Sequence, residues 1–255
     1  MDIPMAEDKG IFCNHVRFSY GRQVVLNDVS FSIGKGVTGL LGVNGAGKTT
    51  LLNILSTLKK PTIGEVFIAG CDLSSHKGIE EARKKLGFLP QHFEVMNFSS
   101  VEDNVAYAAW SHGVSDGKVG EAVRRVIQSV NLEEKAKTKA RKLSGGQRQR
   151  LGVACAIAHD PQIVILDEPT VGVDPLQRND LRALIKDLGK EHTVILSTHL
   201  VDDIARIAQT LLILNNGRLA YDGSIADLEE VKKLKSDSPI DTATAIEHAF
   251  ARLAV

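Results

Sequence analysis

One stretch decides the fold class of this chain, Gly42-Val43-Asn44-Gly45-Ala46-Gly47-Lys48-Thr49, which matches every position of the pattern of a phosphate-binding loop. Apolar Leu40 and Leu41 precede it, and apolar residues at helical spacing follow it from Leu51 onward. A loop of this kind joins a buried strand to the start of a helix, so the flanking pattern is the one that the motif requires. The sequence therefore predicts an α/β core with a phosphate site at a strand–helix junction.

The residue types of this loop suit a polyphosphate. Glycines allow the backbone to wrap around phosphates with its N–H groups pointing inward, and the start of the following helix adds partial positive charge. Lys48 would place a full charge on the β and γ phosphates of a nucleotide, and Thr49 would offer a hydroxyl to magnesium. We expect the nucleotide to be bound here by Gly42, Asn44, Gly45, Gly47, Lys48, Thr49 and Thr50.

Such a loop needs a carboxylate at the end of a neighbouring strand to hold the metal ion. Asp167 ends the apolar run 163–166 and is placed to orient magnesium through its water shell. Glu168 follows it and would lie nearer to the attacking water, as a base or as a water-positioning group. Kinases, GTPases and ATPases share these features, but the chain has no guanine-selective Asn-Lys-x-Asp segment, which weighs against a GTPase.

Two kinds of strand pattern surround this site. Residues 16–20, 29–33 and 66–68 alternate between apolar and polar side chains, a pattern typical of half-buried antiparallel strands. Residues 163–166 and 194–196 are continuous apolar runs, which are typical of parallel strands covered on both faces. We therefore expect an α/β fold with a parallel sheet core and an N-terminal antiparallel β layer.

Helix signals lie between these strands. Asp174 followed by Pro175 predicts a helix start, and Gly189 predicts the end of that helix. Ser99 with Glu102 is the best match to a capping box, and it opens a mostly helical part of the chain. The sequence therefore predicts a helical insertion between the phosphate loop and the acidic pair.

A second motif lies between the phosphate loop and the acidic pair, Leu143-Ser144-Gly145-Gly146-Gln147. Ser144 suits a helix cap, and Gly145 and Gly146 would leave backbone N–H groups open beside the positive end of a helix. This stretch resembles the signature sequence of ABC-type ATPases, and the chain resembles the ATP-binding subunits of ABC transporters over residues 11 to about 222. The resemblance implies that Ser144, Gly145, Gly146 and Gln147 contact the γ-phosphate of an ATP molecule held by a second subunit.

The resemblance assigns roles to further residues. Tyr20 lies where the family has an aromatic side chain that stacks on adenine. Gln91 matches the glutamine that touches magnesium and the attacking water and senses the transmembrane partner. Asp174 matches the loop that crosses the dimer interface, and His199 matches the histidine that reaches the γ-phosphate. The implied catalytic residues are Glu168, His199 and Gln91, and the implied metal site consists of Thr49, Gln91 and Asp167.

The fold implied is that of a P-loop NTPase with a RecA-like parallel sheet core, an N-terminal antiparallel β layer and a helical insertion subdomain. We expect the ABC ATPase domain to span residues 1–222, with the helical insertion at about 92–143. Residues 223–255 would form a C-terminal tail. Within this tail the sequence predicts a proline-broken linker at Ser236–Pro239 and a short amphipathic helix over Thr242–Leu253.

Departures from the family pattern are small. Val43 stands where proline is frequent and Val173 stands where leucine is commoner, and neither position carries a catalytic group. We expect an active ATPase that powers separate transmembrane permease subunits, and the compact form resembles the exporter-type subgroup. A soluble ABC ATPase outside transport stays open as the alternative. A small-molecule kinase would leave the signature segment and His199 without a role.

Composition agrees with such a subunit. Lysine plus arginine, 31 residues, equals aspartate plus glutamate, 31 residues, so charge gives no reason to expect nucleic acid as a partner. The scattered Cys13, Cys71 and Cys155 fit no metal site or disulfide framework and suit a reducing cytosol. The sequence shows neither a secretory signal nor a run of about 18 apolar residues. We expect ATP and magnesium as ligands, a homodimer or a pair with a paralogous ATPase subunit, and a cytoplasmic location, peripheral on the cytoplasmic face of the membrane.

Overall fold

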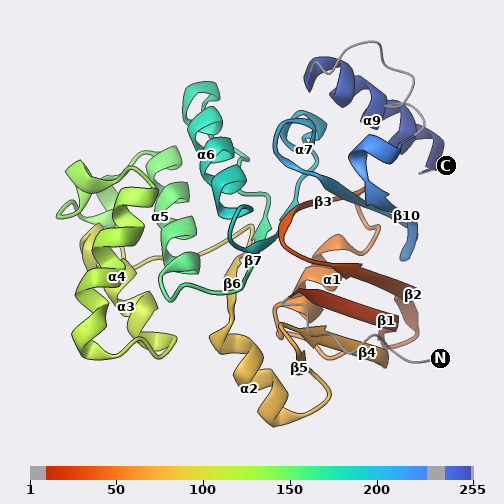
Figure 1. Cartoon of the computed structure of the whole chain (residues 1–255), viewed down its shortest axis with the longest axis horizontal. Coiled ribbons are helices and arrows are strands. Elements are labelled where there is room, and N and C mark those ends of the chain that lie inside the picture. Colours follow the sequence, from red (N-terminus) through yellow and green to blue (C-terminus); the bar gives the residue numbers. More distant parts are fainter. Residues whose placement is uncertain (1–9, 229–238, 254–255) are drawn as a thin grey trace.

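Two sheets organise the chain, and the predicted α/β architecture is confirmed (Figure 1). The computed structural model describes residues 10–228 and 239–253. The first sheet has four antiparallel strands in the order β2-β1-β4-β5, and it contains the three segments predicted from alternating side chains. Its strands are β1 (Ile11–Tyr20), β2 (Gln23–Ile33), β4 (Ile63–Ile68) and β5 (Cys71–Asp72).

The second sheet forms the centre of the molecule and has six strands in the order β10-β9-β3-β8-β7-β6. All neighbours in it are parallel except the antiparallel pair of β9 and β10. Every residue of β7 and β8 is buried, as their continuous apolar runs predicted. Because β8 lies between β3 and β7, the carboxyl ends of these three strands meet at one edge of the sheet. The strands are β3 (Gly36–Gly42), β6 (Leu86–Leu89), β7 (Ile163–Asp167), β8 (Thr193–Ser197), β9 (Thr210–Asn215) and β10 (Arg218–Ser224).

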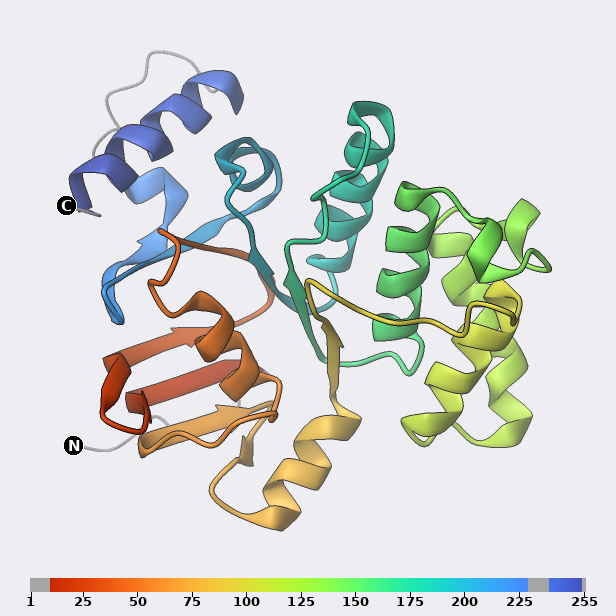
Figure 2. The same cartoon turned by 180° about the vertical axis from the view of Figure 1, so that it is seen from behind.

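Apolar side chains cover both faces of the central sheet. On one face α1 lies between this sheet and the antiparallel sheet, and its buried Leu51, Leu52, Ile54 and Leu55 join residues of β1, β2 and β7 in one cluster. On the other face α5 and α6 pack against β7 and β8 (Figure 2). The helices around the sheet are α1 (Lys48–Leu55), α2 (His76–Lys84), α5 (Gly145–Ile157), α6 (Pro175–Leu188) and α7 (Val201–Ile207).

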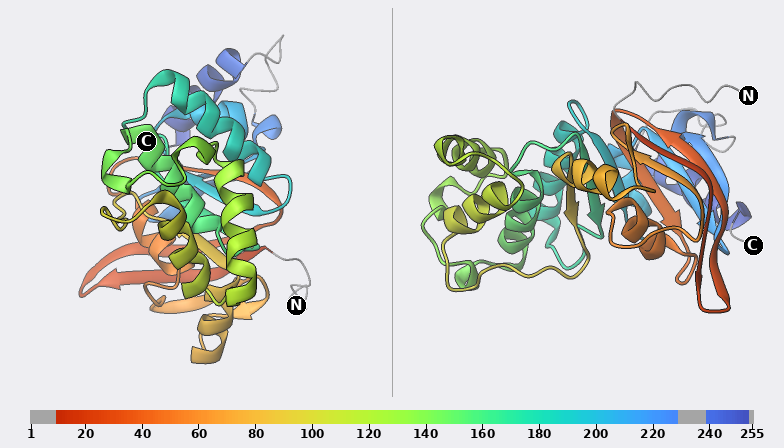
Figure 3. Two further views of the ribbon diagram at one scale, coloured as in Figure 1. Left: turned by 90° about the vertical axis from the view of Figure 1, so that its left-hand side faces the viewer. Right: turned by 90° about the horizontal axis from the view of Figure 1, so that it is seen from below.

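The part of the chain between β6 and α5 is helical, and it projects from the end of the molecule opposite to the antiparallel sheet (Figure 3). It contains α3 (Val101–Ser111), α4 (Asp116–Ser129) and the 3-10 turns η1 (Glu133–Lys135) and η2 (Ala140–Lys142). Ala122, Val126 and Ile127, apolar residues at helical spacing in α4, are buried. We propose that this segment is the helical subdomain expected at about residues 92–143.

The predicted capping box of α3 was placed one residue too early. Ser100, not Ser99, caps the helix, and its partner is Asp103, not Glu102. The Ser100 hydroxyl accepts from the Asp103 backbone N–H at 3.1 Å, and the Asp103 carboxylate accepts from the Ser100 N–H at 3.0 Å. Ser99 instead uses its carbonyl to accept from the Ala140 N–H, which ties it to the end of the insertion. A short acidic side chain thus closes the box as a glutamate would.

The C-terminal residues pack on the central sheet. Helix α9 (Pro239–Leu253) places the fully buried Ile246 and Ala249 in a cluster with Leu41 and Ile213. The helix begins earlier than the predicted Thr242, whereas residues 236–238 of the predicted linker lie outside the described residues. Strand β10 continues past Asp222 to Ser224, and the turn η3 (Ile225–Asp227) follows it, so the division expected after Asp222 falls inside a strand. We propose that the boundary lies beyond Leu228, which is itself buried. In the described parts of the chain, no helix is long and apolar enough to cross a membrane.

His159 lies just after α5 and is largely buried. We expect its titration to make the folded protein less stable in acid. Its ring stacks on His112 with centroids 4.1 Å apart, and burial, with His112 adding to the effect, lowers the pKa of His159 from 6.5 to about 4. Between these values the unfolded chain binds a proton that the folded chain does not, so the free energy of unfolding should fall as pH falls through this window. We expect a loss of about 2 kcal/mol between pH 7.5 and pH 5 from this residue, at about 1.4 kcal/mol per pKa unit.

Urea unfolding at the two pH values tests this prediction. The variant His159→Gln should show a flatter pH dependence than the wild type by about that amount, because glutamine does not titrate. His76→Gln serves as the control, since the His76 side chain is 87% exposed. Parallel pH profiles for wild type and His159→Gln would contradict the assignment.

Candidate active site

The phosphate-binding loop lies where β3 ends and α1 begins, as predicted. Gly47 caps α1 with a φ of 107°, in the left-handed region, and an added Cβ would lie 2.8 Å from the side chain of Leu26. Both facts require glycine at this position. The loop is closed at its base by hydrogen bonds from Ala46 N–H to the Val43 carbonyl and from Gly217 N–H to the Ala46 carbonyl. The N–H groups of the first turn of α1 have no intrahelical partner, which makes this helix start an anion site.

Lys48 reaches over the loop from the first position of α1. Its ammonium donates to the Gly42 carbonyl at 2.6 Å and to the Val43 carbonyl at 3.3 Å. Burial lowers the pKa of Lys48, and the neighbouring carboxylates of Glu168 and Asp167 oppose that effect. The cation therefore stands between the loop and the acidic pair, where it can pair with phosphate oxygens. Beside it, Thr49 is exposed, whereas Thr50 is only 7% exposed, so Thr50 offers a phosphate its backbone N–H more readily than its hydroxyl.

The acidic pair follows β7 at the same edge of the sheet. Asp167 is 5% exposed, and burial raises its pKa, with Glu168 adding to the effect and Lys48 opposing it. Glu168 has a φ of 53°, and its N–H donates to the Ser197 carbonyl of β8 at 2.8 Å. A non-glycine residue in this region of backbone space is uncommon and is often found at functional sites.

His199 faces this carboxylate from the end of the next strand. Its Nδ1 lies 3.0 Å from both carboxylate oxygens of Glu168, and its backbone N–H donates to the same carboxylate at 3.4 Å. The His199 side chain is 59% exposed and that of Glu168 is 10% exposed. The resemblance implied a contact of His199 with the γ-phosphate; in this structure the imidazole is paired with Glu168. Two of the three predicted catalytic side chains, Glu168 and His199, are thus paired at the sheet edge.

The signature segment begins α5, and Ser144 is confirmed as its cap. The Ser144 hydroxyl accepts from the Gln147 N–H at 3.3 Å, and the Gln147 side chain accepts from the Ser144 N–H at 3.1 Å. Gly145 is exposed, and Gly146 packs closely against Gln177 of α6. Asp174 caps α6 and accepts from the Gln177 N–H at 3.1 Å. The two helix starts therefore lie against each other.

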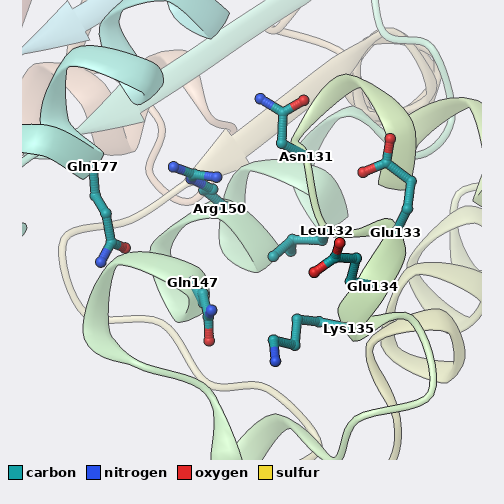
Figure 4. A pocket seen from close by; sticks show the side chains of 8 residues that line it. All are labelled: Asn131, Leu132, Glu133, Glu134, Lys135, Gln147, Arg150 and Gln177. Atoms are coloured by element: carbon teal, nitrogen blue, oxygen red, sulfur yellow. The ribbon is translucent and has the colours of Figure 1, made fainter.

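A polar pocket of about 580 Å³ opens beside these two helix starts (Figure 4). Gln147, Arg150 and Gln177 line it together with segment 131–135. In Figures 1 and 2, α5 lies on the other side of β6 and β7 from α1. One chain thus presents two helix starts suited to anions, those of α1 and α5, and β6 and β7 lie between the two helices.

Two further predicted residues lie at the margins of the site. Tyr20 ends β1 and is 48% exposed, with the ammonium of Lys59 4.9 Å from its ring centroid and the Phe18 ring packed edge-on at 5.0 Å. This exposed ring is available for stacking. Gln91 is exposed in the loop after β6, and it lines a small pocket together with Gly145 and Arg148.

Comparison with known proteins places this geometry in a family. The sequence pattern of the family described as ABC transporter matches residues 26–171. The chain belongs to this family. It is 36% identical over 225 residues to a methionine import ATP-binding protein, MetN, of Ligilactobacillus salivarius, a match that covers 84% of this chain and 64% of that relative. Less than two thirds of the relative's own length is therefore matched.

Solved structures agree with the assignment of this ABC family chain. A structure titled as the ATP binding subunit of an ABC transporter matches 96% of this chain and all of that chain, with a TM-score of 0.82 and 25% identity. The dimeric structure of MJ0796, titled a bacterial ABC transporter cassette, matches 84% of this chain and 98% of that chain, with a TM-score of 0.74 and 27% identity. The resemblance inferred from the sequence, and the P-loop fold that it implied, are thus confirmed.

The magnesium site expected in this ABC family chain has oxygen donors of the right kind. The Thr49 hydroxyl and the Asp167 carboxylate are hard ligands, and Mg²⁺ is usually bound by one or two such groups together with substrate phosphates. No group of three or more His, Cys, Asp or Glu side chains in residues 10–228 and 239–253 is placed to hold a metal ion by itself. The Thr49 and Asp167 oxygens fit an ion that is also bound by nucleotide phosphates.

Proposed function

We propose that this chain binds and hydrolyses ATP and powers transport through separate membrane subunits. The observation that carries the proposal is the meeting of the phosphate loop, the acidic pair and His199 at the ends of the adjacent strands β3, β7 and β8. Membership of the ABC transporter family supports it, as does the relative whose name is an import ATP-binding protein. A soluble ABC ATPase would share the same site, so the transport part of the proposal depends on a membrane partner.

Each residue of the site has a role in this proposal. Lys48 and the N–H groups at the start of α1 bind the β and γ phosphates, and Tyr20 stacks on the adenine. Thr49, Asp167 and Gln91 would hold magnesium, which supplies charge neutralisation of the phosphates when it is bound. Glu168 orients the attacking water and accepts its proton, and His199 holds the Glu168 carboxylate and donates to the developing phosphate charge.

The separation of the two anion sites favours a dimer. The start of α5 at Ser144 belongs to a helix that lies across β6 and β7 from α1 and its phosphate loop, so we propose that it closes over the nucleotide of a second subunit. The dimeric structure of MJ0796, a similar ABC transporter cassette, supports a dimer for this chain. Asp174, at the neighbouring helix start, would lie at the same interface. Whether the second subunit is a copy or a paralogue stays open in this proposal.

A groove beside β6 suits the membrane partner. It has a volume of about 860 Å³ and lies between β6, α3 and α5. Three exposed large side chains line it, Leu58 at 64%, Met96 at 39% and Tyr107 at 56%, and the Trp110 ring, 59% exposed, lies with its centroid 6.0 Å from that of Tyr107. Exposed apolar patches of this kind mark interaction sites. We propose that a segment of the permease docks here, which would hold the chain peripherally at the cytoplasmic face of the membrane.

Two measurements test this function. Purified wild type should release phosphate from ATP in the presence of magnesium. Affinity purification from detergent-solubilised membranes should recover a polytopic membrane protein with the wild type but not with Trp110→Glu, provided that the variant still binds ATP. Failure to recover any polytopic membrane protein with the wild type would contradict the transport role, and equal recovery by both proteins would contradict the docking groove.

A further inference from the structure

A cluster of buried polar side chains joins the loop after β7 to helices α6 and α7. Thr170, Arg182 and Asp203 are 0%, 8% and 0% exposed. One carboxylate oxygen of Asp203 accepts from the Thr170 hydroxyl. The other accepts from Arg182, through Nε at 2.7 Å and also through Nη2. Charged side chains are rarely this deeply buried unless they are paired, and we call these three residues the buried cluster.

The members of the buried cluster come from α6 and from the segments that carry Glu168 and His199, which we call the catalytic pair. Thr170 lies two residues after Glu168, in the loop that ends at the α6 cap Asp174. Asp203 lies in the first turn of α7, four residues after His199. Arg182 lies on α6, which runs beside α7 in Figures 1 and 2. Asp203 is therefore bonded at once to the Glu168 loop and to α6.

Further bonds restrain Arg182 on both of its sides. Its Nη2 donates to Asp202 at 2.6 Å, and its Nη1 contacts Asn179 at 3.3 Å. Asp202 also pairs with Arg206 at 2.8 Å, at the exposed edge of α7. The guanidinium is planar and its donors are fixed relative to one another, so several bonds at once determine its position. The buried cluster thus sets the distance between the Glu168 loop and α7.

The catalytic pair needs such a restraint. Glu168 has left-handed backbone geometry, which persists only where the surrounding structure enforces it. The strand contact from Glu168 N–H to the Ser197 carbonyl fixes the backbone on one side. The loop after Glu168 then turns through Gly172, which has a φ of 73°. Thr170 is the side chain of this loop that is bonded to the element following His199.

We propose that Thr170 and Asp203 are positioning residues that hold the Glu168 carboxylate and the His199 imidazole in the relative position needed for ATP hydrolysis. This proposal rests on the proposed function. Within residues 10–228 and 239–253, the side-chain hydrogen-bond partners of these two residues are each other and Arg182, and none belongs to the phosphate loop or α1, so we expect them to act on the chemical step and not on nucleotide binding. A small displacement of reacting groups lowers the rate of that step strongly.

The test replaces the Thr170 hydroxyl without changing the shape of the side chain. For Thr170→Val we expect kcat for ATP hydrolysis to fall about tenfold, since Glu168 and His199 are then misplaced relative to each other. KM and the dissociation constant for ATP should stay within about twofold, because the phosphate loop is unaffected. Thr170→Ser keeps the hydroxyl and should restore most of the lost kcat. An unchanged kcat in Thr170→Val, or a parallel loss of kcat and ATP affinity, would overturn the proposal, as would equal activities of the two variants.

A second variant tests the same proposal in case Thr170→Val does not fold. Arg182→Gln with Asp203→Asn replaces the ion pair by two neutral amides and leaves no unpaired charge inside the protein. It should show the same loss of kcat with the same ATP affinity, and wild-type kcat in this variant would count against the proposal. Arg206→Gln is the matched control, because it removes the exposed ion pair to Asp202 and leaves Thr170 and Asp203 bonded; its kcat should equal that of the wild type.

Failure of the proposed function gives a different result. If the wild type binds ATP but releases no phosphate, the proposed activity fails, and the positioning role is rejected with it. If the wild type hydrolyses ATP and Thr170→Val does so equally fast, the activity stands and the positioning role is rejected.

Discussion

Replacement of Lys48 by alanine is expected to abolish ATP turnover. The lysine ammonium is the cation that lies between the loop carbonyls of Gly42 and Val43 and the acidic pair. Without it, the triphosphate would meet Asp167 and Glu168 with one counter-charge fewer, in a partly buried site where charges are weakly screened. We expect phosphate release to fall by about a thousandfold or more, a loss comparable to that of other groups which stabilise transition-state charge.

Binding of ATP should weaken as well, because the lysine also contacts the ground-state phosphates. Phosphate release and binding of a fluorescent ATP analogue are measured on the same preparations, with circular dichroism to confirm folding. Lys60→Ala is the matched control, since Lys60 is an exposed lysine close in sequence to α1, and it should behave as the wild type. A folded Lys48→Ala protein with wild-type turnover would show that the loop is not the site of hydrolysis.

Local patterns predicted the elements of this fold well because each carries its own signal. The phosphate loop is recognised from glycines that the backbone requires, such as Gly47 with its left-handed φ. The caps Ser144 and Asp174 were found from residue type and position alone. The cap of α3 was misplaced because adjacent serines offer the same signal, and the choice between them depends on the contact of Ser99 with Ala140.

Contacts between distant segments were beyond such patterns. Thr170, Arg182 and Asp203 resemble ordinary helix and loop residues in the sequence, and they meet only because β7 and β8 are neighbours. The pairing of His199 with Glu168 depends on the same strand order. The sequence predicted an amphipathic helix in the tail, but it gave no sign of what its apolar residues Ile246 and Ala249 pack against, which is the cluster that contains Leu41 and Ile213.

The second large effect is expected from Glu168→Gln. The amide keeps the shape of the side chain and one acceptor for the His199 N–H, but it removes the charge that accepts a proton. We expect ATP to bind normally and hydrolysis to slow by at least about a hundredfold. The loss of a negative charge beside the γ-phosphate also reduces repulsion. The variant should therefore accumulate with ATP bound.

Accumulation of bound ATP should be visible as a dimer. If the start of α5 from one chain closes on the γ-phosphate held by the other, ATP joins the two subunits, and hydrolysis removes the shared group. Size-exclusion chromatography with light scattering is expected to show Glu168→Gln as a dimer with ATP and magnesium and as a monomer with ADP. A dimer that forms equally without nucleotide would contradict this mechanism.

Adding Ser144→Arg to Glu168→Gln should abolish the ATP-dependent dimer. A bulky cation at the start of α5 blocks the approach of the partner's nucleotide, although it also removes the helix cap, which costs about 1 kcal/mol. The chain offers a control for that second effect: Ser100 caps α3 with the same reciprocal pattern, through Asp103, in the helical insertion. Ser100→Arg in the Glu168→Gln background should lose a cap of equal kind and still dimerise with ATP. If both arginine variants fail to dimerise, cap loss explains the result, and if both dimerise, the start of α5 is not the γ-phosphate clamp; only loss confined to Ser144→Arg supports a nucleotide bound between two subunits.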